Sequence, residues 1–549
     1  MGCSCKETTV GSFMDDCPYL TAAYIFGGLS MMLNIRLAYS SAPYALIRFK
    51  LPENLFSVFV RRMASALELW CLPSMLLGNI VDVAMKSSAK SKEEFNLDHS
   101  QPTQNDSENT KLGKLILMKR WKYIWIIYPS ILTMWSDFIT YLILLIVYVI
   151  GDQGNVTGYY AVIAISGFIF GINMTLLYAA DWRYIPVYIA GENSFPMLTS
   201  IMHYFTTLIF GNRRKWNSDF LIVTIDICVA IIISLVTAIL WTYSYLSNHG
   251  KDNANKFKFN TNAAYDAYGT AGAKTGTARD IGGNHADKIK EGAGGDAYLA
   301  TEDGFQKYWH LLPPNNYTGT SFPYPTSIVP ALMIMIGMGF VYCIYPGIAP
   351  GMIVPFYLVD KIETVLLVLT TFPPVIIAIL QKYQAEWSPK FNDAGTFKEW
   401  TEYPAGQVCI GLSILMVIKL SLLGMFIYCL HYRDSHISRS IVNQPKMSTF
   451  LSIVFYMCHE ILLALGFSGF IGNNGGDFIL IPQWIGALLM IFLAFYSEGY
   501  IIEYKSHDPS HWPTEGMTKW NAFCYWCKRA SKITHHNLAS LFKICLFRG

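Results

Sequence analysis

The strongest constraint on this chain is a series of apolar runs about 20 residues long, the length that an α-helix needs to cross a hydrocarbon core of about 30 Å. Lipid offers no hydrogen-bond partner to an exposed backbone, so such runs are expected to be helical. The predicted spans cover residues 18–40, 64–85, 123–150, 159–180, 184–210, 219–246, 326–346, 357–380, 405–430, 448–471 and 480–502. The prediction is an all-α polytopic membrane protein with about 11 transmembrane helices, six before a long polar gap and five after it.

The composition agrees with a membrane protein and excludes several other classes. The chain has 549 residues, of which 53% are hydrophobic and only 14% are charged, too few to cover a soluble protein of this size. The net charge of +3, without a compact basic domain, argues against nucleic-acid binding. No glycine-rich nucleotide loop is present. No cofactor, resident metal or ATP-driven module is therefore expected.

Polar segments divide the chain into predicted domains. Residues 247–323 are rich in Gly, Ala, Asn and Asp. This composition buries too little apolar surface to fold, so the segment is predicted to be a disordered linker. No secretory signal opens the chain. In order, the predicted parts are a polar segment 1–17, a first helical half 18–246 that includes a polar loop 86–122, the linker 247–323, a second helical half 324–504 and a basic tail 505–549.

The distribution of lysine and arginine gives a mixed signal for orientation. The lysine-rich loop 86–122 favours an N-terminus on the inside, which places Asn155 of the sequence Asn-Val-Thr outside as a glycosylation acceptor. The stretch "GNRRKW" (211–216) and the basic tail would then also lie outside, against the positive-inside rule. The plasma membrane is favoured over an internal membrane.

The tail contains a spacing that two chemistries can use. His507, His511, Cys524 and Cys527 form H-x3-H…C-x2-C, which a tetrahedral zinc site could adopt. The alternative is an amphipathic, interfacial segment around "NAFCYWCKRA" whose cysteines are free or acylated. The second interpretation is preferred, so no metal site is predicted.

Ionisable groups inside the spans are the main functional candidates, because each costs several kcal/mol in hydrocarbon. The candidates are Glu68, Asp137, Asp226, Asp360, Lys361, Glu363, Lys419, His459 and Glu460. The competing interpretation is that a charge near a helix end extends to the water interface. We expect Glu68, Asp137, Asp226 and Lys361 to extend to the water interface in this way.

His459 and Glu460 are adjacent in the middle of a predicted span. Neighbouring residues of an α-helix point about 100° apart, so the two side chains cannot face one cavity equally. Lys419, on the preceding span, is a possible partner for Glu460.

The arrangement of six spans, a polar loop and five spans resembles the equilibrative nucleoside transporter family. In the first span "GGLSMMLN" is similar to the family's Gly-Leu-Ser…Asn stretch, with Asn34 at the asparagine. The stretches "GFIFGINMTLLYAAD" and "IAGENSFPM" resemble its glycine-rich helix and following turn. "YPGI" and "FYLVDKIET" resemble its Phe-Pro-Gly turn and the acidic motif after it, where Asp360 matches and Thr364 replaces an arginine.

Two further stretches are similar to the family. "KLSLLGMFIYC" places Lys419, Gly424 and Cys429 at the family's Arg, Pro and Cys, and "FSGF" (467–470) looks like its F-S-N-G-Y without the Asn. The resemblance implies a transporter-like, major-facilitator-like bundle that moves nucleosides or nucleobases by alternating access, facilitatively or coupled to an ion. Together, the resemblance and the ionisable groups inside the spans predict six solute-binding residues: Asn34, Asn173, Asp360, Lys419, His459 and Glu460.

Two other functions fit the same sequence. The partial motifs also fit a multi-spanning surface or scaffold protein that has lost transport. The aromatic-rich, Asn-rich style of the chain also resembles the multi-spanning, transporter-like Tpr-related proteins of piroplasm parasites, which are apicomplexans. An intramembrane histidine beside an acid would also suit a membrane-embedded acyltransferase, with His459 and His310 as the only candidates. We favour the non-enzyme, whose expected partners are a small polar solute and the lipid bilayer.

Overall fold

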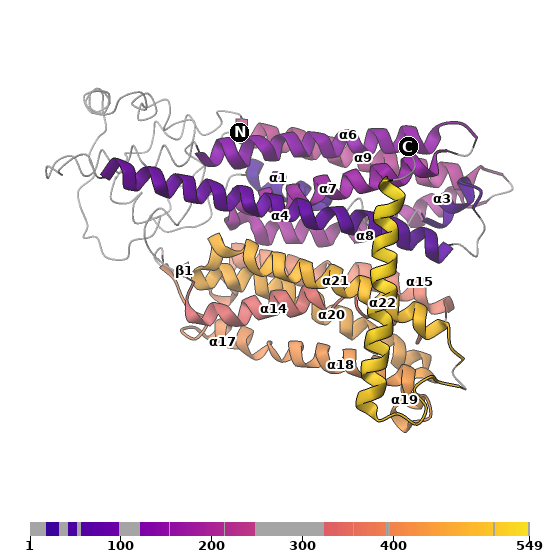
Figure 1. The fold of residues 1–549 in the computed structure, drawn as a ribbon. Helices are drawn as coiled ribbons and strands as arrows, with labels where there is room; N and C mark the ends of the chain where they lie inside the picture. Colours follow the sequence, from indigo (N-terminus) through magenta and orange to yellow (C-terminus); the bar gives the residue numbers. More distant parts are fainter. Residues whose placement is uncertain are drawn as a thin grey trace, which may run out of the picture. The chain divides into compact units, whose positions relative to one another are not determined.

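The structure is a computed structural model, shown in Figure 1. Its described residues are 18–31, 42–51, 56–97, 121–152, 154–212, 215–246, 323–354, 356–390, 392–393, 396–508 and 511–546. The predicted linker 247–323 and segment 1–17 lie outside these ranges, apart from residue 323. The described residues form helices almost throughout. The strands among the described residues are one antiparallel pair of two residues each, β1 (Asn392–Asp393) and β2 (Thr396–Phe397).

The helices before the linker coincide with the six predicted spans of the first half, the first of them only over its described part, 18–31. They are α1 (Pro18–Met31), α3 (Ala42–Arg48), α4 (Phe56–Leu97), η2 (Tyr123–Ile127), α6 (Tyr128–Val149), α7 (Val156–Ala180), η3 (Trp182–Tyr184), α8 (Ile185–Phe210) and α9 (Ser218–Leu246). α4 continues twelve residues into the predicted polar loop 86–122, to Leu97. A loop was therefore the wrong expectation for residues 86–97, where the lysine-rich sequence continues the helix.

The helices after the linker cover the five predicted spans of the second half, several of them in two pieces. They are η6 (Pro325–Ser327), α14 (Ile328–Gly339), α15 (Phe356–Leu369), α16 (Phe372–Tyr383), η7 (Ala385–Trp387), α17 (Pro404–Gly411), α18 (Ile414–His431), α19 (His436–Val442), α20 (Pro445–Phe470), η8 (Ile471–Gly475), η9 (Gly476–Phe478), α21 (Leu480–Lys505) and α22 (Lys519–Leu546). Residues 340–354, with Pro346 and Pro350, form consecutive turns in place of the end of the predicted span 326–346.

Eight of the described helical segments are long and apolar enough to cross a membrane. Two of them, Pro404–His431 and Pro445–Gly475, begin at a proline, where a missing N–H costs no helical hydrogen bond. The predicted all-α multi-spanning fold is confirmed for the described residues. The chain is an integral, multi-pass membrane protein.

Contacts divide the chain into two compact units. Unit 1 contains residues 1–330, 374–410 and 467–481, and unit 2 contains residues 331–373, 411–466 and 482–549. Each unit therefore draws on more than one stretch of sequence. Each has its own apolar core: Tyr141, Tyr148 and Tyr159 are central in unit 1, and Phe426, Phe455 and Trp526 in unit 2.

In unit 1, α4 and α7 pack with their backbones in close contact at glycines. A Cβ built on Gly167 would lie 2.4 Å from the carbonyl oxygen of Leu67, and one on Gly171 would lie 2.5 Å from that of Cys71. Gly167 and Gly171 are four residues apart, so they occupy one face of α7. Small residues at such spacing allow helices to approach closely in lipid, where the hydrophobic effect does not drive them together.

A single asparagine joins three segments of unit 1 where α20 passes into η8. The Oδ1 of Asn473 accepts hydrogen bonds from the Thr326 hydroxyl at 2.7 Å and from the Trp400 backbone N–H at 3.2 Å. Its Nδ2 donates to the Gly469 carbonyl at 2.8 Å. Asn473 is fully buried, so each of these bonds satisfies a group that water cannot reach.

Replacing Asn473 by alanine is expected to destabilise unit 1 by roughly 1–3 kcal/mol, because the buried Trp400 N–H and Gly469 carbonyl lose a partner. Thermal unfolding of the purified protein in detergent measures this. Asn474→Gly is the matched control. Asn474 has φ +62°, a conformation that glycine adopts without strain, so this variant should be as stable as wild type or more so. Equal melting temperatures for Asn473→Ala and wild type would contradict the assigned role.

Candidate functional site

A fully buried lysine is the centre of the candidate site in unit 2. Lys419 lies in the middle of α18, a helix of apolar residues, and has no exposed surface. Its ammonium group donates a hydrogen bond to the backbone carbonyl of Gly337 on α14 and lies 5.3 Å from the centre of the Phe455 ring. The carbonyl and the aromatic face both offer negative potential to the cation.

His459 and Glu460, on α20, complete this centre. The Nδ1 of His459 lies 2.7 Å from the same Gly337 carbonyl oxygen that accepts from Lys419. Its Nε2 lies 3.9 Å from the Glu460 Oε1, and both residues are buried. Glu460 also interacts electrostatically with Lys419. The structure thus brings together three of the six predicted solute-binding residues.

The Gly337 carbonyl is available to two donors because the helices pack closely at this position. A Cβ on Gly337 would lie 3.1 Å from the Leu462 Cβ, one turn after His459. Lys419, His459 and Glu460 can each carry or exchange a proton. This centre, buried in an apolar bundle, is therefore suited to binding a polar group or a proton. We define Lys419, His459, Glu460 and the Gly337 carbonyl as the Lys419 centre.

Asn173 belongs to unit 1, whereas the Lys419 centre belongs to unit 2. It is fully buried on α7, and its Oδ1 accepts a hydrogen bond of 2.5 Å from Thr133. Its Nδ2 has no hydrogen-bond partner in the described part of the chain, and neither do the hydroxyls of Tyr178 and Tyr188. The two tyrosine rings lie edge to face, 5.4 Å apart. Unpaired buried donors of this kind are characteristic of a site completed by water or a ligand.

Several predicted residues are outside what the structure describes. Asn34 lies in the undescribed segment 32–41, and His310 in 247–322. Asp360 lies one turn inside α15, but its side chain is not described, nor are those of Glu68, Lys361, Glu363 and Thr364. Asp137 and Asp226 are described and buried against protein, whereas we expected them to extend to the water interface. That expectation was wrong because neighbouring helices cover both carboxylates.

A charged cleft in unit 1 escaped the sequence analysis. Asp82 and Lys86 on α4 form an ion pair of 2.6 Å and line the cleft with the buried Lys122 and with Trp182. The ammonium of Lys390 lies 5.3 Å from the Trp182 ring centre. Asp82 lies inside the predicted span 64–85, so its position within an apolar run was a signal that could have revealed it.

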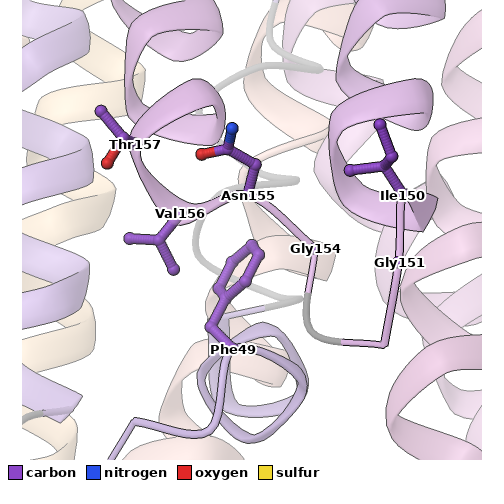
Figure 2. A pocket seen from close by; sticks show the side chains of 7 residues that line it. All are labelled: Phe49, Ile150, Gly151, Gly154, Asn155, Val156 and Thr157. Carbon is purple, nitrogen blue, oxygen red and sulfur yellow. The ribbon is translucent and has the colours of Figure 1, made fainter.

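A surface pocket of about 450 Å³ lies beside the turn that joins α6 to α7. Figure 2 shows the Phe49 ring between this turn and the start of α7, with no ionisable side chain among the lining residues. Arg48 donates to the carbonyls of Gly151 and Asp152 at 2.8 and 2.7 Å, which holds the turn in place. None of the predicted solute-binding side chains that the structure describes lines this pocket, so we do not assign it to the solute.

Asn155 lines the same pocket and begins α7. Its Oδ1 accepts from the Gly158 backbone N–H at 2.9 Å, an N-cap that explains an asparagine at this position without a sugar. The side chain is exposed. Glycosylation of Asn155 remains a prediction.

The tail residues of the possible zinc spacing have other surroundings. His507 lies 3.1 Å from the buried Glu503, which also accepts a 2.6 Å hydrogen bond from the Arg529 Nε. That hydrogen bond raises the pKa of Arg529 and keeps its guanidinium charged. Cys524 is an exposed free thiol. Among the described residues, no three His, Cys, Asp or Glu side chains come close enough together to hold a metal ion.

The fold and these centres define a class: a multi-pass, all-helical membrane protein with ionisable and amide groups buried among its spans. No protein-family model matches the chain, and no curated protein matches it. Among solved structures, the chain is similar to the major facilitator superfamily proton:xylose symporter XylE bound to 6-bromo-6-deoxy-D-glucose. That match has 13% sequence identity and a TM-score of 0.42, over 96% of this chain and 95% of the other.

Proposed function

We propose that the protein is a transporter that moves a small polar solute across the membrane by alternating access. The observation that carries the proposal is the Lys419 centre, because a buried ammonium, imidazole and carboxylate cost stability in a lipid-embedded helix. Such groups characteristically mark solute or ion pathways in membrane proteins. The unpaired donors of Asn173, Tyr178 and Tyr188 support the proposal with a second polar centre.

A nucleoside or nucleobase is the proposed solute class. It rests on the resemblance of the span pattern and of "FYLVDKIET" to equilibrative nucleoside transporters. In this proposal the carboxylate of Asp360 accepts hydrogen bonds from sugar hydroxyls, and amides such as Asn173 pair with the polar edges of a base. Thr364 cannot supply the planar donor fork of an arginine, so sugar binding relies more heavily on Asp360.

We propose that a proton gradient supplies the energy when the solute is taken up against its own concentration gradient. His459 and Glu460 carry exchangeable protons inside the bundle, and Lys419 shares the Gly337 carbonyl with His459. A proton on this centre would change its charge and therefore the relative stability of the two access states. Without such coupling, transport is facilitative.

Uptake by the purified full-length protein in liposomes tests the proposal. Labelled nucleosides, nucleobases and a hexose are offered with and without an inward proton gradient, beside protein-free liposomes. Saturable uptake of a nucleoside or base that Asp360→Asn lowers about tenfold or more supports the proposed solute. Saturable uptake of the hexose alone would retain the transporter and reject the nucleoside. The absence of saturable uptake for every solute would contradict the transport proposal.

A further inference from the structure

The last described helix, α22, carries basic residues and no acidic ones. Its residues Lys519–Leu546 read "KWNAFCYWCKRASKITHHNLASLFKICL" and include no Asp or Glu. The cationic residues are Lys519, Lys528, Arg529, Lys532 and Lys543. Such a helix presents positive charge without internal compensation, so it favours an anionic partner.

One face of α22 is packed on α21. Trp526, Ala530 and Thr534 are buried, at spacings of four residues that align them on one side of the helix. The Thr534 hydroxyl donates to the Phe495 carbonyl at 3.1 Å. A Cβ on Gly499 would lie 2.6 Å from the Ala530 carbonyl oxygen, so the glycine lets the two backbones approach.

The contacts place α22 against the C-terminal half of the spanning helix α21, from Phe495 to Glu503. Arg529 binds Glu503, two residues before α21 ends at Lys505. Figure 1 shows α22 running across α21 and not alongside it. A helix that runs across a spanning helix lies closer to the plane of the membrane than to the membrane normal.

The first two turns of α22 expose two aromatic rings on the side that packs on α21 further along, and the opposite side of the helix carries exposed lysines. Trp520 is 70% exposed and Phe523 is 57% exposed, and the lysines at 528 and 532 are exposed as well. Tryptophan and other aromatic rings favour the headgroup level of a bilayer, and lysine extends from there toward phosphate. A water-facing helix would gain nothing from exposing these two rings.

We propose that α22 is an amphipathic surface helix that binds anionic phospholipid headgroups of the membrane that the chain spans. Trp520 and Phe523 insert at the boundary between headgroups and acyl chains, and Lys528 and Lys532 contact the phosphates and carboxylates of anionic lipids. Each lysine near an anionic surface strengthens binding by roughly fivefold at physiological salt. The bilayer is the chosen occupant because the helix starts from a membrane span and carries only positive charge.

Hydrogen–deuterium exchange of the full-length protein in lipid nanodiscs tests this proposal. Peptides within 519–539 are compared in discs of phosphatidylcholine alone and in discs that also contain phosphatidylserine. We expect amide exchange in α22 to be at least about fivefold slower with phosphatidylserine, and the difference to disappear in high salt. Peptides of α20 provide the reference for intact spans.

Variants separate lipid binding from folding. The Lys528→Glu, Lys532→Glu double variant should lose the difference between the two lipids, whereas Lys382→Glu with Lys446→Glu, equal in charge change and exposed outside α22, should keep it. Lys528→Gln with Lys532→Gln repeats the test should the glutamates unfold the helix. Equal exchange of wild-type α22 in both lipids, with α20 protected, would overturn the proposal.

Discussion

Replacing Lys419 by methionine is expected to abolish most solute uptake, by about tenfold or more, while leaving the protein folded. Methionine has a similar length and removes a cation that is fully buried. The Gly337 carbonyl retains His459 as a partner at 2.7 Å, so no backbone acceptor is left unpaired. Exchanging buried charge for an apolar side chain is often neutral or stabilising. A melting temperature at or above that of wild type is therefore expected.

Measuring uptake and thermal stability on the same preparation distinguishes function from structure. Lys382→Met on α16 is the matched control, because that lysine is exposed and should tolerate the change in both assays. His459→Gln extends the test to the second donor of the Gly337 carbonyl. Wild-type uptake by Lys419→Met would show that the ammonium only fills space between α14 and α18, and the Lys419 centre would lose its assigned role.

A Cβ added at Gly167 is expected to separate α4 from α7 and to destabilise the protein by roughly 1–3 kcal/mol. The Cβ of Gly167→Ala would lie 2.4 Å from the Leu67 carbonyl oxygen, a backbone atom that cannot move without shifting α4. Because alanine favours helix over glycine by about 1 kcal/mol, a loss of stability identifies the clash as its cause. Thermal unfolding in detergent measures the effect.

Gly424→Ala is the internal control for this experiment. Gly424 is exposed on α18, and a Cβ built there meets no atom within 4 Å, so only the gain in helix propensity of about 1 kcal/mol applies. We expect opposite changes in melting temperature for the two glycine-to-alanine variants. A Gly167→Ala protein as stable as Gly424→Ala would mean that α4 and α7 can separate at little cost.

The span pattern was predictable because hydrocarbon thickness imposes one length on every crossing helix. Helix interruptions were harder to predict. α15 ends at Leu369 and α16 starts at Phe372, within a run predicted as one span. The buried Thr370 hydroxyl bonds the Leu367 carbonyl there, which is a local interaction that apolar periodicity does not report. The helical character of residues 86–97 was missed for a related reason, because charge alone does not stop a helix.

The candidate site was predictable in its residue types and not in its geometry. A lysine and a His-Glu pair inside apolar runs identified Lys419, His459 and Glu460, because burial of charge is costly wherever the helices lie. Nothing in the sequence indicated that the carbonyl of Gly337 would serve both Lys419 and His459. Asn473 was missed as well, because its three partners come from residues 326, 400 and 469.

The sequence by itself determined that this chain is a helical membrane protein with costly polar groups inside its spans, since lipid imposes length, helicity and a penalty on charge. The tertiary structure decided which of those groups meet. Close packing at Gly337 brings a lysine of α18 and a histidine of α20 to one carbonyl, and Gly499 admits α22 against α21. Such contacts depend on which helix faces pack together, a property of pairs of segments that no single segment encodes.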